Sequence, residues 1–107
     1  MFDMDEAIKE CEEKKRDDEI ICFAIGAGRV MPKNRKEKKE IAKALKFIMS
    51  LDGFLGIYPH DMDSTAIIFD TLNNAKGAYN LMKAKEISLG NIVPIMVNKR
   101  YLEGYNG

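Results

Sequence analysis

The chain has 107 residues, of which 46% are hydrophobic and 32% charged, and its 17 basic and 17 acidic side chains balance to a formal net charge of zero. These values fit one domain of ordinary size and exclude a disordered or fibrous chain. Two cysteines are too few for a secreted disulfide framework, and the acidic N-terminus is unlike a signal peptide. No stretch approaches the roughly 18 apolar residues of a membrane span. We therefore expect a cytoplasmic protein with reduced thiols and no membrane partner.

Residues 1–18 are expected to form an acidic amphipathic helix ahead of a single domain at 19–107. Asp3 and Glu6 have the spacing of a helix N-terminal cap, and an apolar stripe follows at helical spacing: Met4, Ala7, Ile8 and Cys11. The unbroken apolar run Ile20–Ala27 has the length and composition of a central strand. Glycine and proline in the following residues predict a loop.

The second helix is predicted to begin after Asn34, which has Glu37 three residues later, and to end at Asp52–Gly53. Its inward stripe comprises Ile41, Ala44, Leu45, Ile48 and Met49. Two strands, Phe54–Tyr58 and Thr65–Asp70, flank a polar connector rich in turn-forming residues. We expect these two strands to form an antiparallel hairpin.

A third helix is predicted after the hairpin, capped by Asn73 or Asn74 and followed by Gly90. Ile92–Val97 is expected to be the last strand. The order of elements after the leader helix is therefore strand, helix, strand, strand, helix, strand. This order predicts an α+β, ferredoxin-like βαββαβ fold, in which a four-stranded antiparallel sheet carries two helices on one face. Pro94 cannot donate to a sheet ladder, which places the fourth strand at an edge.

Residues 64–97 combine an apolar strand that ends in Phe69, a helix that carries Ala75 and Ala78, a glycine turn and a final strand. This pattern, which covers about a third of the chain, resembles the second half of an RNA-recognition-motif domain. In that register, Ser64 and Ala66 stand where the family carries the aromatic rings that stack on RNA bases, and the family's preceding basic and glycine residues are absent. The resemblance implies the ferredoxin-like architecture without the RNA contacts.

The charges are strongly segregated along the chain. Residues 1–19 contain nine acidic and four basic side chains, whereas residues 29–46 contain eight basic and two acidic ones. The basic segment leaves a glycine-containing loop and enters a helix, an arrangement suited to an anion or a nucleic acid. Its candidate binding residues are Arg29, Lys33, Arg35, Lys36, Lys38 and Lys39. The alternatives are a solvated helix face, or an acidic leader that folds back onto the basic segment.

Other chemistry-bearing residues favour no catalytic or metal site. His60, Asp61 and Asp63 share one connector, but hairpin tips use such residues for turn chemistry, and no fourth ligand stands nearby. Cys22 lies inside the first strand, where a thiol behaves as a small hydrophobic group, and it has no basic neighbour to activate it. We therefore expect a non-enzymatic protein without cofactor or metal. A small enzyme stays open as a third class only because ferredoxin-like sheets can host active sites near their loops.

The helix-free face of the sheet is the most informative surface. Alternation along the strands gives the sheet two apolar faces. The set expected to face the helices comprises Ile21, Phe23, Ile25, Ile67, Phe69, Val93 and Ile95. The opposite set contains the predicted protein interface, Cys22, Phe54, Tyr58, Ala66, Ile68 and Met96, together with Ile20, Ala24 and Ile92. A face this apolar requires a cover, which the leader helix, a second copy or a ligand could supply. The sequence favours a small regulatory or binding module that acts through protein–protein contact, as a homodimer or with a different partner. The alternative is a nucleic-acid-binding protein that uses the basic segment.

Overall fold

A computed structural model of the chain describes residues 3–27, 34–59, 65–85, 87 and 89–101. Its elements are α1 (Met4–Lys14), β1 (Glu19–Ala27), α2 (Arg35–Met49), β2 (Phe54–Pro59), β3 (Thr65–Phe69), α3 (Leu72–Ala84) and β4 (Leu89–Asn98). The four strands form one antiparallel sheet in the order β2-β3-β1-β4. The predicted α+β, ferredoxin-like fold with an additional N-terminal helix is confirmed, and β4, which carries Pro94, is an edge strand. In the described ranges, no helix combines the length and the apolar character needed to cross a membrane.

Side-chain caps set the N-terminal ends of the helices. The Asp3 carboxylate accepts from the Glu6 backbone N–H at 3.3 Å, and the Asn34 side chain accepts from the Glu37 N–H at 2.8 Å, as predicted. The predicted cap of α3 is wrong. Thr71, directly after β3, caps that helix by accepting from the Asn74 N–H, and α3 ends at Ala84, so that Gly90 lies inside β4 instead.

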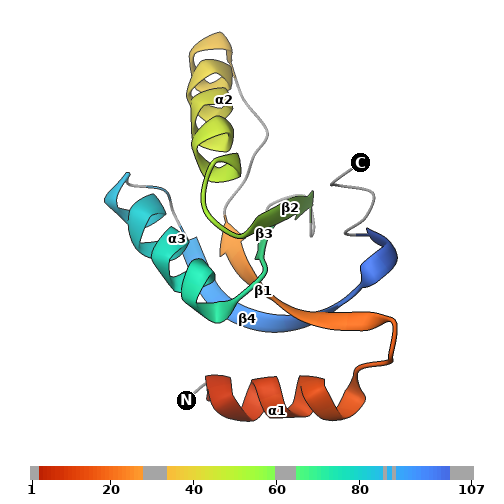
Figure 1. The fold of residues 1–107 in the computed structure, drawn as a ribbon. Coiled ribbons are helices and arrows are strands. Elements are labelled where there is room, and N and C mark those ends of the chain that lie inside the picture. Colours follow the sequence, from red (N-terminus) through yellow and green to blue (C-terminus); the bar gives the residue numbers. More distant parts are fainter. Residues whose placement is uncertain (1–2, 28–33, 60–64, 86, 88, 102–107) are drawn as a thin grey trace.

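The main core lies between the sheet and α1 and α3. Phe69 and Ile25 from the central strands and Met82 from α3 are fully buried within it, and Met4 and Ile8 of α1 pack against it. The thiol of Cys11 on α1 donates to the Pro94 carbonyl of β4 at 3.8 Å. Figure 1 accordingly shows α1 and α3 on the same side of β1 and β4. Helix α1 thus packs against the edge strand β4 on the helix-bearing side of the sheet.

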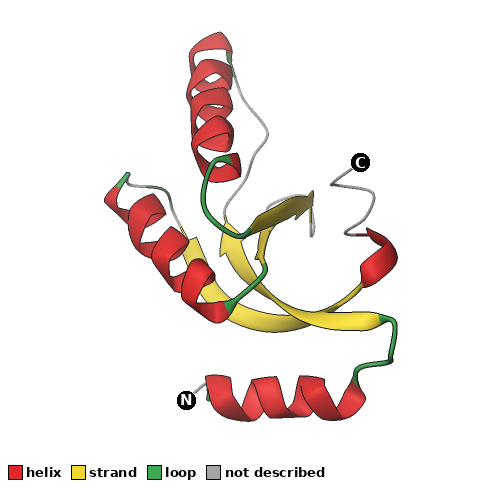
Figure 2. Ribbon diagram, in the orientation of Figure 1, coloured by secondary structure: helices red, strands yellow, loops and turns green. Residues whose placement is uncertain are grey.

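Helix α2 is only partly packed on the sheet. Its C-terminal end contributes the buried Ile48, and Phe47 packs against the core and lies under the Lys85 ammonium at 4.8 Å from the ring centroid. The preceding apolar residues Ile41, Ala44 and Leu45 belong to neither apolar cluster of the described residues. Figure 2 shows the helix projecting away from the sheet by its N-terminal half.

Strand pairing corrects the predicted side of several residues. In β4, Ile92 pairs with Ile25 and Met96 with Ile21, which places both on the helix-bearing face. Val93 and Ile95, opposite Ala24 and Cys22, therefore lie on the open face. In β2 the register shifts between Phe54 and Gly56, which turns Phe54 toward the helices, where its ring meets Phe69 edge-on at 6.2 Å. A bulge of this kind breaks the strict alternation on which the prediction depended.

Candidate binding surface on the open face of the sheet

The open face of the sheet has an apolar cluster of its own. Cys22, Ala24 and Ile68 are buried at its centre. Around them pack half-buried apolar side chains from all four strands: Ile20, Leu55, Tyr58, Ala66, Ile95 and Val97. The described residues place no helix across this cluster, since α1 and α3 both lie on the other side (Figure 1). The sheet therefore presents apolar side chains on both faces, as predicted.

A hollow of about 790 Å³ opens on this face. Its floor includes the small residues Ala24, Gly26 and Ala66, and larger side chains such as Tyr58 and Ile95 border it. The hollow exists because these floor positions lack side-chain bulk between bulkier neighbours. Its shape suits a convex apolar group, such as an aromatic ring or the ridge of a helix.

One end of the hollow is held by contacts between the start of β1 and the end of β4. The Asn98 amide donates to the Asp18 carboxylate at 3.0 Å, and the Lys99 N–H donates to the Asp18 carbonyl at 2.8 Å. The Asn98 side chain also accepts from the Arg100 N–H at 2.9 Å, where a helical turn begins. This turn brings Tyr101 to the hollow, with 65% of its surface exposed.

The hollow is apolar at its centre and weakly acidic at its rim. Of the described residues that line it, Glu19 alone is charged. One oxygen of the Glu19 carboxylate accepts from the Arg16 backbone N–H at 2.9 Å, which fixes the position of the acid. A partner that brings a cationic side chain beside Glu19 would therefore match the charge of the rim.

The predicted interface residues divide into three groups. Tyr58 and Ala66 lie on the open face and line the hollow. Ile68 also lines the hollow although it is only 2% exposed, whereas Cys22 is 0% exposed on the same face and supports the surface from beneath. The assignment of Phe54 to this interface is wrong, because Phe54 packs against the core on the helix side. Met96 pairs with Ile21 on the helix side, although it also borders the hollow at the edge of the sheet.

The sequence pattern places one exposed apolar side chain of the open face on the wrong side of the sheet. Val93 is 36% exposed and lines the hollow, together with its neighbours Ile95 and Val97. Alternation could not find them because every residue of the run 92–97 is apolar, so either register satisfies the pattern.

The surroundings of the Cys22 thiol disfavour its ionised form. Burial raises the pKa of this thiol, and the negative charge of Asp70 raises it further. The thiolate is the nucleophilic and metal-binding form of cysteine, and both causes disfavour it here. Cys22 therefore acts in the floor of the open face as a small apolar group.

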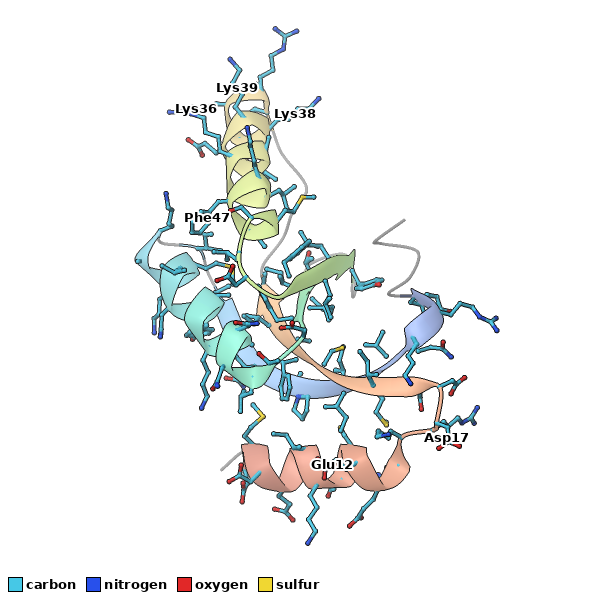
Figure 3. The ribbon with its side chains drawn as sticks, in the orientation of Figure 1. Glu12, Asp17, Lys36, Lys38, Lys39 and Phe47 are labelled. Atoms are coloured by element: carbon cyan, nitrogen blue, oxygen red, sulfur yellow. The ribbon has the colours of Figure 1, made fainter. Side chains whose placement is uncertain are left out.

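The basic and acidic segments lie at opposite ends of the molecule. Figure 3 shows Lys36, Lys38 and Lys39 near the free end of α2, and Glu12 and Asp17 at the α1 end. Arg35 is exposed beside these lysines, whereas Arg29 and Lys33 lie outside the described residues. The alternative in which the leader folds back onto the basic segment does not hold for α1 and α2 (Figure 1).

His60, Asp61 and Asp63, whose pattern in the sequence favours turn residues over metal ligands, lie outside the described residues. Elsewhere, the described part of the chain brings together no group of three His, Cys, Asp or Glu side chains suited to a metal ion.

Comparison of the chain with protein-family models, with curated proteins and with solved structures finds no match.

Proposed function

We propose that the protein is a non-enzymatic, cytoplasmic binding module that associates with a second copy of itself through the open face of its sheet. The observation that carries the proposal is the hollow of about 790 Å³, bordered by Val93, Ile95 and Tyr58 and left uncovered by the helices. Burial of apolar surface contributes about 25 cal/mol per Å², so covering a few hundred Å² of this face would favour association by several kcal/mol. The two unpaired thiols, Cys11 and Cys22, accord with a reducing compartment.

A protein partner fits this surface better than a small ligand. The apolar cluster extends past the hollow to Ile20 of β1 and Leu55 of β2, which pack against its centre without lining the hollow. A small molecule that filled the hollow would leave these two side chains uncovered. A partner as broad as the sheet would cover both the hollow and its surroundings.

The experiment that tests this function is measurement of the mass of the freshly purified protein by native mass spectrometry. We expect a species of two chains at micromolar concentration. A single chain that carries a small molecule would assign the face to a ligand instead. A bare single chain would contradict the proposal.

A second function, nucleic-acid binding, has one observation in its favour. The cationic side chains Arg35, Lys36, Lys38 and Lys39 are exposed at the end of the molecule remote from the acidic helix α1, so α1 does not neutralise them. Ala66 stands where the resembling RNA-binding family carries a stacking ring, so any contact through this fold would depend on phosphates and not on stacked bases.

For nucleic-acid binding, we expect retention on a single-stranded oligonucleotide that falls steeply as salt rises, because phosphate contacts release counterions. The double variant Lys36→Glu/Lys39→Glu should abolish this retention. The control variant Lys9→Glu/Lys76→Glu makes the same charge change on α1 and α3 and should lower retention less. Equal retention of the two variants, or retention insensitive to salt, would exclude this function.

A further inference from the structure

Helix α2 carries an apolar stripe that lies mostly outside the two apolar clusters of the described residues. Ile48, near the C-terminal end, is 4% exposed in the core, but Ile41, Ala44 and Leu45 pack against neither apolar cluster among the described residues. Among the elements, the main contact of α2 with the sheet is with the edge strand β2. The helix is therefore anchored at one end (Figure 2). The apolar stripe along the rest of the helix is half-buried.

The open face and α2 are complementary in shape and in charge. The hollow is concave with a floor of small residues, and a helix ridge is convex. The one charged side chain that lines the hollow in the described residues is Glu19, whereas Arg35–Lys46 of α2 contains six basic and two acidic residues. No described residue of α2 lines the hollow of its own chain.

We propose that α2 of one copy inserts its apolar stripe, Ile41, Ala44 and Leu45, into the open-face hollow of a second copy. This inference rests on the proposed self-association and names the element that makes it. Two copies related by a two-fold axis would each donate one helix and receive one. Such reciprocal exchange closes the assembly at a dimer and covers the open face and the α2 stripe of both copies at once.

The basic helix α2 could instead bind the acidic helix α1 of a second copy, but this contact would be weaker than contact with the hollow. Met4 and Ile8 of α1 already pack against the core of their own chain, so α1 offers α2 mostly charged side chains. Ion pairs on an exposed surface contribute little and are weakened by salt, whereas each buried isoleucine or leucine contributes more. The hollow therefore outcompetes α1.

The first test compares two identical substitutions on α2. Ala44→Asp places a carboxylate in the stripe, whereas Ala42→Asp places it at an exposed position outside the stripe. Both change alanine to aspartate in the same helix, so the loss of helix propensity is matched. Sedimentation equilibrium should show at least a tenfold weaker dimer for Ala44→Asp and a change below threefold for Ala42→Asp. Equal dissociation constants for the two variants, both folded by circular dichroism, would overturn the inference and leave α2 to the nucleic-acid function.

The second test locates the contact by cross-linking in a Cys11→Ser background, where the remaining Cys22 is buried. Leu45→Cys protein is mixed with Val93→Cys protein and treated with a short bis-maleimide. We expect the mixed pair to cross-link in preference to either variant alone. Efficient cross-linking of Val93→Cys to itself would show two open faces in contact, which overturns the role of α2 and leaves the proposed function standing. Absence of every cross-link, with a monomeric mass, would overturn both.

Discussion

Val93→Lys should weaken the proposed dimer by roughly 100-fold, because it places an ammonium group on the apolar surface that we propose a second copy covers. Burial of a charge without a partner costs several kcal/mol, and each 1.4 kcal/mol changes a dissociation constant tenfold. The single chain should tolerate the change, since Val93 is 36% exposed on an edge strand, where lysine is common. Sedimentation equilibrium measures the dissociation constant, and urea unfolding measures the stability of the variant.

The matched control is Leu81→Lys, which replaces an apolar side chain that is 52% exposed on α3, on the opposite side of the sheet. It should change the dissociation constant by less than threefold. A second variant, Ala66→Trp, fills the hollow with an apolar ring and should also weaken association, which separates loss of shape from added charge. If Val93→Lys and Leu81→Lys changed the dissociation constant equally, the open face would not be part of the interface.

Gly53→Ala should lower the free energy of unfolding by about 2 kcal/mol or more. Gly53 has a φ of +79°, in the left-handed region that costs a residue with a Cβ roughly 1–2 kcal/mol. A methyl group there would also collide with the side chains of Asp70 and Asn74, which are joined by a hydrogen bond of 2.8 Å. The Gly53 carbonyl accepts from the Asp70 N–H at 2.9 Å, so the turn cannot move freely to relieve the collision.

Gly77→Ala is the control for that substitution and should have the opposite sign. Gly77 lies inside α3, and a Cβ at this position would meet no atom within 4 Å. Alanine there should stabilise the protein by about 0.5–1 kcal/mol, because it lowers the entropy lost on folding. Urea unfolding of both variants gives the comparison. A Gly53→Ala protein as stable as the unchanged chain would contradict the description of this turn.

The sequence was sufficient for the fold because its elements carry signals that agree with one another. Asn34 with Glu37, the apolar run of β1 and the edge position of Pro94 each predict what the structure has. Local patterns and global topology therefore point to the same architecture. The first residue of α3 was harder to predict, because the hydroxyl of Thr71 offers an N-terminal cap as good as the side chain of Asn73 or Asn74.

The sides of the edge strands could not be predicted, for two physical reasons. Every residue of 92–97 is apolar, so shifting β4 by one position exchanges two equally apolar sets and the pattern cannot choose between them. In β2, the register shift after Phe54 moves one aromatic ring to the helix side while Tyr58 stays on the open side. The existence of an apolar open face was therefore predictable, whereas the identity of its exposed residues required the strand pairing.

The packing of α2 could not be predicted from the sequence either. Its stripe has the spacing of a core helix, and the expectation was that all of it packs inside the same chain. The structure buries Ile48 and leaves Ile41, Ala44 and Leu45 outside the apolar clusters of the described residues. Hydrophobic periodicity indicates that a helix face will be covered, but it does not tell which molecule covers it.

The mass of the unmodified protein in solution tests most directly whether a second copy covers the open face. One chain has a mass of 12.1 kDa, so the dimer should appear at about 24 kDa by native mass spectrometry and by light scattering, and should dissociate on dilution. Hydrogen exchange at Val93 and Ile95 should slow as the dimer forms. A mass of 12.1 kDa at every concentration, with unchanged exchange on this face, would contradict the proposal that the open face is an interface between copies.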